Sequence, residues 1–286
     1  MTKIDHSKHK AGFVNIIGKP NVGKSTLMNA LVGEKLAIIT SKAQTTRHRI
    51  IGIVNGEDFQ IVYSDTPGIM EPHYKLQESM MKVVASSFSD ADLFLVIVEI
   101  GDRSIELFSE RLHKSPAPKI FILNKMDLHS EEKVAEEVAF WKNEFKADQY
   151  FTVSALEKQG TAELFDSIIE MLPYHAPFYD KETFTDRPTR FFISEIIREK
   201  ILINYKQEIP YSVDILIESF KEEEKIIRIS SIIICNRRSQ KPILIGKGGS
   251  MLKKVGTQAR IDMEEFLGKK SVLGNFSTSA RKLAGK

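Results

Sequence analysis

The chain has 286 residues, of which 42% are hydrophobic and 28% charged, with a formal net charge of +3. These are ordinary values for a folded soluble protein and exclude disordered and fibrous classes. The longest apolar run, residues 93–98, is far shorter than the roughly 20 residues of a membrane-spanning helix. The first ten residues lead into no apolar core of a signal peptide. The one cysteine, Cys235, cannot form an internal disulfide, which predicts a reducing compartment, most simply the cytoplasm.

Between about residues 10 and 173, short β-rich runs alternate with stretches of helical spacing. Such apolar strands, separated by helices, predict an α/β domain with a largely parallel sheet covered on both faces. Ligands of such sheets bind outside the carboxyl ends of the strands, so the residues after each run are the candidate site residues. The expected strands are residues 13–17, 50–54, 59–64, 93–98, 119–123 and 150–153.

The first run is followed by GKPNVGKS, residues 18–25, which fits the phosphate-loop pattern GxxxxGK[ST]. Glycines let the backbone N–H groups of such a loop wrap round a phosphate at a helix N-terminus. Lys24 supplies a positive charge to the β- and γ-phosphates, and the hydroxyl of Ser25 can hold Mg²⁺. The predicted phosphate-binding residues are Gly18, Asn21, Val22, Gly23, Lys24, Ser25 and Thr26.

A second motif, Asp65-Thr66-Pro67-Gly68, follows the 59–64 run. The carboxylate of Asp65 can hold Mg²⁺ through water, and the N–H of Gly68 can contact a γ-phosphate. By itself this is a good turn sequence, and such turns are more often structural than functional. Its place one strand from a phosphate loop favours the functional interpretation.

The last two motifs, NKMD (residues 124–127) and SAL (residues 154–156), follow the last two runs. The carboxylate of Asp127 can accept hydrogen bonds from N1–H and the exocyclic amine of guanine, whereas adenine would leave a buried Asp127 unpaired. An isolated NKxD is as often a helix cap, and SAL, where a backbone N–H could meet guanine O6, is weak alone. The predicted guanine-binding residues are Asn124, Lys125, Asp127, Ser154, Ala155 and Leu156.

In order and spacing these four motifs resemble those of the P-loop GTPases, and the resemblance covers about residues 10–173. It implies that KAQTTRH, residues 42–48, is the first switch and that residues 68–77 form the second, which loses order on hydrolysis. A threonine of the first switch should complete the Mg²⁺ shell, and alignment favours Thr46 over Thr45. The implied metal ligands are Ser25, Thr46 and Asp65. The implied switch and catalytic residues are Thr45, Thr46, Asp65, Thr66, Pro67 and Gly68.

Two positions qualify this resemblance. Ras-like enzymes place a water-orienting glutamine just after the DxxG glycine, but here that residue is Ile69. We therefore expect slow intrinsic hydrolysis, with the attacking water positioned by other groups. Asn21 matches an asparagine that binds K⁺ in some related GTPases, so hydrolysis stimulated by K⁺ is a further hypothesis.

The balance of charge changes near residue 187. Residues 1–186 contain 21 basic and 27 acidic residues, a net charge of −6, whereas residues 187–286 contain 20 and 11, a net charge of +9. Pro173, Pro177 and Pro188 lie within 16 residues that have no periodic pattern, which predicts a linker. The excess positive charge of the second half is explained either by a solvated surface without a partner or by binding to a polyanion.

The basic half has helical spacing over residues 190–203, strand alternation over 211–220 and 226–234, and two apolar helical segments that flank GKGG, residues 246–249. This is the order of a type-2 KH domain, whose GxxG loop clamps about four nucleotides of single-stranded RNA. GxxG alone is expected by chance, with a helix–helix turn as the plain alternative. Its placement and the lysines nearby favour RNA, with single-stranded DNA as the remaining alternative. The predicted RNA-binding residues are Ile243, Ile245, Gly246, Lys247, Gly248, Gly249, Lys253 and Lys254.

A GTPase domain followed by this module resembles the Era family of bacterial GTPases. The segments KAQTTRH, DTPG, DRPTRFFISEIIREK and IPYSV carry the resemblance, which spans nearly the whole chain. It implies a GTPase domain at 10–173, a linker at 174–189 and a KH domain at 190–286. It also implies a GTP-hydrolysing switch that binds 16S rRNA near its 3′ end, assists 30S subunit assembly and contacts the inner membrane peripherally; we expect a monomer.

Two other classes of function stay open at this stage: an RNA scaffold in which the nucleotide is mainly a conformational ligand, and a signalling switch at the membrane surface. One feature departs from the Era pattern. Era proteins normally finish the KH fold with a longer apolar strand, whereas residues 269–280 read KKSVLGNFSTSA. We therefore expect only a stub of the final strand.

Overall fold

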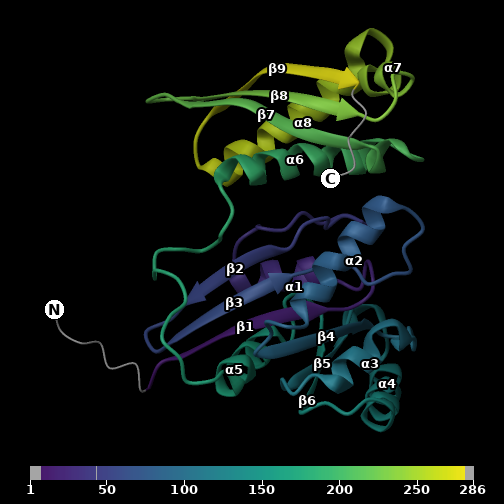
Figure 1. The fold of residues 1–286 in the computed structure, drawn as a ribbon, viewed down its shortest axis with the longest axis vertical. Helices are drawn as coiled ribbons and strands as arrows, with labels where there is room; N and C mark the ends of the chain where they lie inside the picture. The colour runs from purple at the N-terminus through teal and green to yellow at the C-terminus, as the bar shows by residue number, and fades with distance from the viewer. Residues whose placement is uncertain (1–7, 43, 281–286) are drawn as a thin grey trace, which may run out of the picture. The chain divides into compact units, whose positions relative to one another are not determined.

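We describe a computed structural model of the protein, in which residues 8–42 and 44–280 are described (Figure 1). Contacts divide the chain into two compact units, Met1–Asp186 and Arg187–Lys286. Each unit is treated by itself below. Within the described residues, no helix combines the length and apolarity that a bilayer crossing requires.

The first unit is built on a six-stranded sheet with the order β2-β3-β1-β4-β5-β6. All its neighbours pair in parallel except β2 and β3, which are antiparallel. All six predicted strands are present, so the prediction of a mostly parallel α/β sheet is confirmed. The strands are β1 (Lys10–Ile17), β2 (Ile50–Asn55), β3 (Phe59–Asp65), β4 (Leu93–Glu99), β5 (Lys119–Asn124) and β6 (Gln149–Val153).

Helices cover both faces of this sheet (Figure 1). Side chains of α2, α3 and α4 share one buried apolar cluster with β4 and β5, which includes Phe94, Phe121 and Trp141. On the opposite face, α1 packs against β2 and β3 and also contacts α5. The helices are α1 (Lys24–Val32), α2 (Lys75–Ser87), α3 (Glu106–Lys114), α4 (Glu131–Glu144) and α5 (Thr161–Met171), with a short 3-10 helix η2 (Met126–Leu128).

A segment that we call the strap, residues 174–186, is bound to the sheet of the first unit. The buried amide of Gln60 accepts hydrogen bonds from the backbone N–H groups of Phe178 and Tyr179, at 2.7 and 3.0 Å, and donates to the carbonyl of Tyr179 at 2.8 Å. Further along, the N–H of Ile53 in β2 donates to the carbonyl of Phe184 at 2.9 Å.

The strap differs from the predicted linker, because contacts place all of it in the first unit. It contains no helix or named strand, so polar groups of its backbone bond to residues of β2 and β3 instead. This leaves only residues 187–189 of the predicted linker outside the first unit.

The second unit has a three-stranded sheet with the order β7-β8-β9, covered by α6 and α8 (Figure 1). β7 pairs with β8 antiparallel, and β9 pairs with β8 in parallel. The elements are α6 (Thr189–Asn204), η3 (Ile209–Tyr211), β7 (Val213–Glu222), β8 (Ile227–Cys235), α7 (Gln240–Ile245), η4 (Lys247–Gly249), α8 (Ser250–Leu267) and β9 (Ser271–Ala280).

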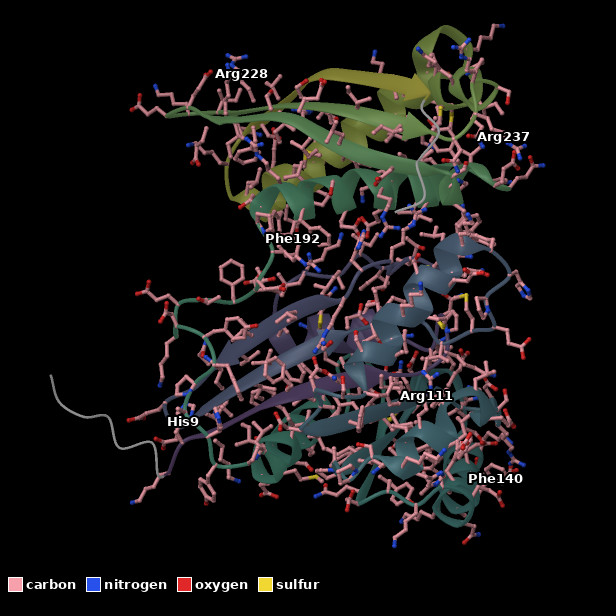
Figure 2. The ribbon with its side chains drawn as sticks, in the orientation of Figure 1. His9, Arg111, Phe140, Phe192, Arg228 and Arg237 are labelled. Carbon is pink, nitrogen blue, oxygen red and sulfur yellow. The ribbon has the colours of Figure 1, made fainter. Side chains whose placement is uncertain are left out.

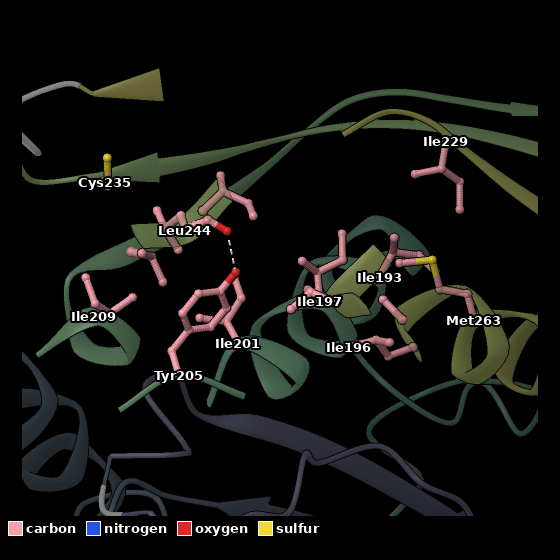
Figure 3. Close-up of a cluster of buried hydrophobic side chains, with 14 of the residues drawn as sticks. Ile193, Ile196, Ile197, Ile201, Tyr205, Ile209, Ile229, Cys235, Leu244 and Met263 are labelled. Carbon is pink, nitrogen blue, oxygen red and sulfur yellow. Dashed lines mark hydrogen bonds between the residues drawn. The ribbon is translucent and has the colours of Figure 1, made fainter. Parts of the chain in front are cut away.

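The core of this unit fixes the short helix α7. Ile193, Ile197 and Ile201, spaced four residues apart on α6, are fully buried with Leu244 of α7 (Figure 3). The hydroxyl of Tyr205 donates to the carbonyl of Leu244 at 2.5 Å (Figure 3). Since α7 leads directly into GKGG, this packing also positions the loop.

The prediction of a stub for the last strand is wrong. β9 runs for ten residues, Ser271–Ala280, and pairs with β8 along Ile227–Cys235 with one irregularity near Ser231. An edge strand is held by backbone hydrogen bonds to its one neighbour, so it can form without a long apolar run. The described residues thus contain every helix and strand of the predicted KH order; residues 281–286 of its predicted range lie outside them.

Candidate nucleotide and nucleic-acid sites

The four predicted motifs of the first unit surround one cavity of about 560 Å³ at the carboxyl ends of the strands. Six of the predicted residues do not line it: Gly18, Val22, Asp65, Thr66, Pro67 and Ala155. The predicted residues that do line it are Asn21, Gly23, Lys24, Ser25, Thr26, Thr45, Thr46, Gly68, Asn124, Lys125, Asp127, Ser154 and Leu156.

The phosphate loop is tied to the two base-side loops by one buried side chain, Asn124. Its Nδ2 donates to the carbonyl of Val22 at 2.8 Å, and its Oδ1 accepts from the N–H of Ala155 at 3.0 Å. Gly23 has φ 102°, and a Cβ there would lie 2.1 Å from Nδ2 of Asn124. Only glycine therefore allows the loop to pass this close to the amide. The three loops form one connected frame.

Three side-chain oxygens from different segments meet beside Lys24. The hydroxyl of Ser25 donates to Oδ2 of Asp65 at 2.6 Å and lies 3.0 Å from the hydroxyl of Thr46, which is 3.2 Å from the same Oδ2. Asp65 is fully buried, and its Oδ1 has no hydrogen-bond partner among the described residues. Two hydroxyls and a buried carboxylate with an unused oxygen are a donor set that fits Mg²⁺.

The neighbouring threonine, Thr45, takes a different direction. Its hydroxyl donates to the carbonyl of Lys42 and contacts the hydroxyl of Thr40, both at 2.6 Å. Among the two predicted switch threonines, the structure thus brings Thr46, and not Thr45, to the oxygen cluster. Ala43 of the predicted first switch lies outside the described residues.

Burial perturbs the two charged groups at the centre of the site. Lys24 is buried, and its ammonium donates to the carbonyl of Lys19 at 2.6 Å. Burial lowers the pKa of Lys24 to about 8, although the charge of Asp65 opposes this. Burial likewise raises the pKa of Asp65, against the effects of Lys24, Ser25 and Thr46. Neither the Lys24 ammonium nor the Asp65 carboxylate is fully compensated by its neighbours. This suits a site in which an anion binds beside the lysine and a cation beside the carboxylate.

An ion pair that the sequence analysis missed anchors the phosphate loop from outside. The ammonium of Lys19 donates to both carboxylate oxygens of Asp102, at 3.1 and 3.0 Å. Asp102 follows β4, at the same edge of the sheet as the other motifs. That position after a predicted strand was the available signal.

The start of the second switch is packed against the phosphate loop. The hydroxyl of Thr66 donates to the carbonyl of Ile16 at 2.8 Å, and the N–H of Ile69 donates to the carbonyl of Gly18 at 3.1 Å. The side chain of Ile69 is buried in the apolar cluster with Val84 and Phe108. It points into the core, so nothing at this position orients a water molecule.

The two switches touch through a residue pair that the motifs did not indicate. Gln44 lines the cavity with a left-handed backbone, φ 63°, and its Oε1 accepts a hydrogen bond from the hydroxyl of Tyr74 at the start of α2. A non-glycine residue with positive φ is uncommon and marks a position held by its surroundings. The contact joins the first switch to the second.

On the base side, Asp127 lies in η2 and lines the cavity, but it is exposed. Because η2 lies at the rim, discrimination between purines depends on the base covering the carboxylate. Ala155 has its N–H occupied by Asn124. Leu156 is 72% exposed at the rim, and the ammonium of Lys125 pairs with Glu99 at 2.6 Å.

In the second unit, the predicted RNA-binding residues gather at the end of α7 and the start of α8. Gly248 has φ 58° with open space where a Cβ would be, so its backbone conformation, and not packing, calls for glycine. Ile243 is 53% exposed. Ile245, Gly246 and Gly249 are half-buried, and Lys247, Gly248, Lys253 and Lys254 are exposed. The surface offers glycine backbone, apolar contact and positive charge side by side.

Comparisons with known proteins agree with this division. A family model described as a 50S ribosome-binding GTPase matches residues 13–125, and a KH domain model matches residues 208–276. GTPase Era of Thermoanaerobacter sp. strain X514 is 41% identical over 273 residues, which are 93% of this chain and 89% of that protein. GTPase Era of Syntrophus aciditrophicus is 43% identical over 263 residues, covering 90% and 86%.

The chain belongs to the Era family. Solved Era structures match both of its units. Era in complex with MgGDPNP and nucleotides 1506–1542 of 16S ribosomal RNA is 33% identical, with a TM-score of 0.89 over 97% of this chain and 95% of that one. An Aquifex aeolicus Era variant bound to GDP·AlF4⁻ is 34% identical, with a TM-score of 0.87 over 95% and 94%.

Proposed function

We propose that this Era-family protein is a Mg²⁺-dependent GTPase that binds 16S rRNA near its 3′ end and assists assembly of the 30S ribosomal subunit. The observation that carries the proposal is a single cavity lined by Lys24, Ser25 and Thr46, with Asp127 on its rim and the buried Asp65 hydrogen-bonded to the two hydroxyls. The similar Era structure with MgGDPNP and 16S rRNA supports both ligands.

Each group of the cavity then has a task with GTP or GDP. Lys24 places its charge on the β- and γ-phosphates, and the N–H of Gly68 contacts the γ-phosphate. Ser25, Thr46 and Asp65 would hold Mg²⁺, which supplies positive charge to the phosphate oxygens when it is bound. Asp127 accepts from the Watson–Crick edge of guanine, beside Asn124 and Leu156. Because Ile69 is buried in the core, intrinsic hydrolysis is slow.

The test is phosphate release from GTP by the full chain, with and without a 16S rRNA 3′-end fragment. We expect slow turnover alone and faster turnover with the RNA. An RNA scaffold that uses nucleotide only as a conformational ligand would show no stimulation, and that result would replace the proposal.

K⁺ is a separate proposal, carried by Asn21. Asn21 lines the cavity with φ 66°, and its amide donates at 3.0 Å to the carbonyl of Ser41, just before the first switch. Its side-chain oxygen and the switch backbone are the kind of ligands that hold K⁺ near the phosphates. Hydrolysis should be faster in K⁺ than in Na⁺ at equal ionic strength, and Asn21→Ala should remove the difference. Equal wild-type rates in both salts would reject the proposal.

Cellular placement follows from the family resemblance. We propose a cytoplasmic monomer with peripheral contact to the inner membrane. Vesicle co-sedimentation with neutral and anionic lipids tests the contact, and sedimentation velocity tests the monomer. Binding that is absent from both vesicle types, or a dimer at micromolar concentration, would contradict the respective proposal.

A further inference from the structure

Three cations stand outside the predicted RNA clamp, on the turn that enters α7. Arg237 and Arg238 follow β8, and Lys241 lies in the first turn of α7. All three side chains are exposed. We call them the entry cluster.

The backbone of this turn is held firmly. Gln240 is 4% exposed; its Oε1 accepts from the N–H of Arg237 at 3.0 Å, and its Nε2 donates to the hydroxyl of Ser212 at 2.8 Å. The N–H of Asn236 also donates to the carbonyl of Ser212 at 3.1 Å. A buried amide thus holds the backbone from which the three cations project.

Several cations of the second unit have acidic partners, although Lys221 and Lys225 of the β7–β8 hairpin have no ion pair with a described residue. At the opposite end of the unit, Arg228 pairs with Glu223 at 2.9 Å, and two lysines of the α8–β9 connection pair with acidic residues at 3.1 and 3.3 Å. Figure 2 shows Arg228 and Arg237 at opposite ends of the unit. No member of the entry cluster forms an ion pair with any residue that the structure describes, and the same holds for Lys247, Lys253 and Lys254.

The entry cluster is close to the clamp and continuous with it. α7 has six residues, a length of about 9 Å at 1.5 Å per residue. Lys241 and Ile245 are four residues apart, so they share a face of α7. An RNA strand that left GKGG along this face would reach the entry cluster. Like charges gathered without counter-charges repel one another unless a polyanion joins them.

We propose that Arg237, Arg238 and Lys241 form a second phosphate-binding surface for the RNA strand where it extends beyond the GxxG clamp along α7. The proposal rests on the proposed RNA binding and adds to it. The clamp takes about four nucleotides, and the entry cluster contacts the phosphates that follow. Its contribution is positive charge at fixed positions, without reading of bases.

The experiment uses the full chain loaded with GDPNP and two labelled single-stranded RNAs from the 16S rRNA 3′ end, four and twelve nucleotides long. The entry variant carries Arg237→Ala, Arg238→Ala and Lys241→Ala. The control variant loses the same charge at the paired end, with Arg228→Ala, Lys269→Ala and Lys270→Ala. Affinity is measured by anisotropy at several KCl concentrations, the shorter RNA by competition.

We expect the entry variant to bind the twelve-nucleotide RNA at least about tenfold more weakly at 0.1 M salt, and its slope of log K against log salt to become shallower by about 2, from three lost single-strand phosphate contacts. Its affinity for the four-nucleotide RNA should change by less than about twofold. The control variant should keep most of the wild-type slope.

An equal loss of affinity for both RNA lengths, or an equal loss in the control variant, would contradict the proposed role of the entry cluster. If the wild type binds both RNAs with the same affinity and the same salt dependence, the proposed clamp is supported and the proposed second surface is rejected. If the wild type binds neither RNA, both the proposed RNA function and the proposed second surface are rejected.

Discussion

The nucleotide cavity and the RNA surface hold their charges in opposite ways. In the cavity, Lys24 and Asp65 are buried and perturbed, and their neighbours contact them at hydrogen-bond distance. On the second unit, Lys247, Lys253 and Lys254 are exposed and have no ion pair with a described residue. A small ligand is selected by enclosed groups at fixed distances, whereas a polyanion is attracted by solvated charges that salt screens. The first site should therefore respond to single atoms and to pH, and the second to charge number and ionic strength.

The largest effect is expected from Asp127→Asn. The substitution replaces one carboxylate oxygen with an NH₂ group, which is a donor and faces a guanine N–H donor. One hydrogen bond to guanine is therefore lost, and the other is no longer charge-assisted. Selection of GTP over ATP should fall by about 100-fold or more, measured by competition against fluorescent GDP. Glu131→Gln, an exposed neutralisation just after η2, is the control and should keep the selection. Unchanged preference in Asp127→Asn would contradict its assignment to the base.

Next in size is Gly248→Asp, which separates the two regions. Aspartate adds negative charge to the clamp and strains a backbone with φ 58°. RNA affinity should fall at least about tenfold at 0.1 M salt, while GTP turnover without RNA stays at the wild-type rate. Gly33→Asp, also at positive φ with open space around it, controls for backbone strain alone. RNA binding that survives the change in Gly248 would reject the KH clamp.

The third prediction concerns pH and belongs to the cavity alone. Because the pKa of Lys24 is lowered from 10.5 to about 8, the free protein loses this charge above pH 8, whereas phosphates would restore it. Nucleotide affinity should fall about fivefold between pH 8 and pH 9, with uptake of nearly one proton at pH 9. Calorimetry in buffers of different ionisation enthalpy measures that uptake. No proton uptake at pH 9 would contradict the lowered pKa of the free lysine or its recharging by the bound phosphates.

The same shift has the opposite sign for folding. Between pH 8 and 10.5 the unfolded chain holds the Lys24 proton and the folded chain does not. The contribution of Lys24 to stability therefore rises with pH in this window and is lowest below it. Chemical denaturation of nucleotide-free protein across the window, compared with Lys24→Met, isolates that contribution.

The last prediction distinguishes two adjacent threonines. Thr46→Ala removes an oxygen from the cluster with Ser25 and Asp65, whereas Thr45→Ala removes a hydroxyl that bonds within the switch. We expect Thr46→Ala to weaken Mg²⁺-dependent GDPNP binding about tenfold, the value of one charge-assisted hydrogen bond, and Thr45→Ala to have a smaller effect. A titration of Mg²⁺ at fixed GDPNP measures both, and the reverse order would exchange their roles.

Much of the first unit could be predicted because its signals are local. Each strand is a short apolar run, and each motif follows directly after one, so the loops at the carboxyl ends could be named before their contacts were seen. The strap could not be predicted in this way. Its backbone is held by Gln60, more than one hundred residues earlier in the chain, and no periodic pattern records such a pairing.

The sequence by itself determined the order of the elements, the glycine and lysine of the phosphate loop, and the unequal charge of the two halves. The tertiary structure decided which groups are buried and which are paired: the oxygen cluster around Asp65, the exposed position of Asp127, the ten-residue β9, and the cations of the entry cluster without described counter-charges. The physical reason is that propensity and motif spacing act over a few residues, whereas burial and charge pairing depend on which distant segments the fold brings together.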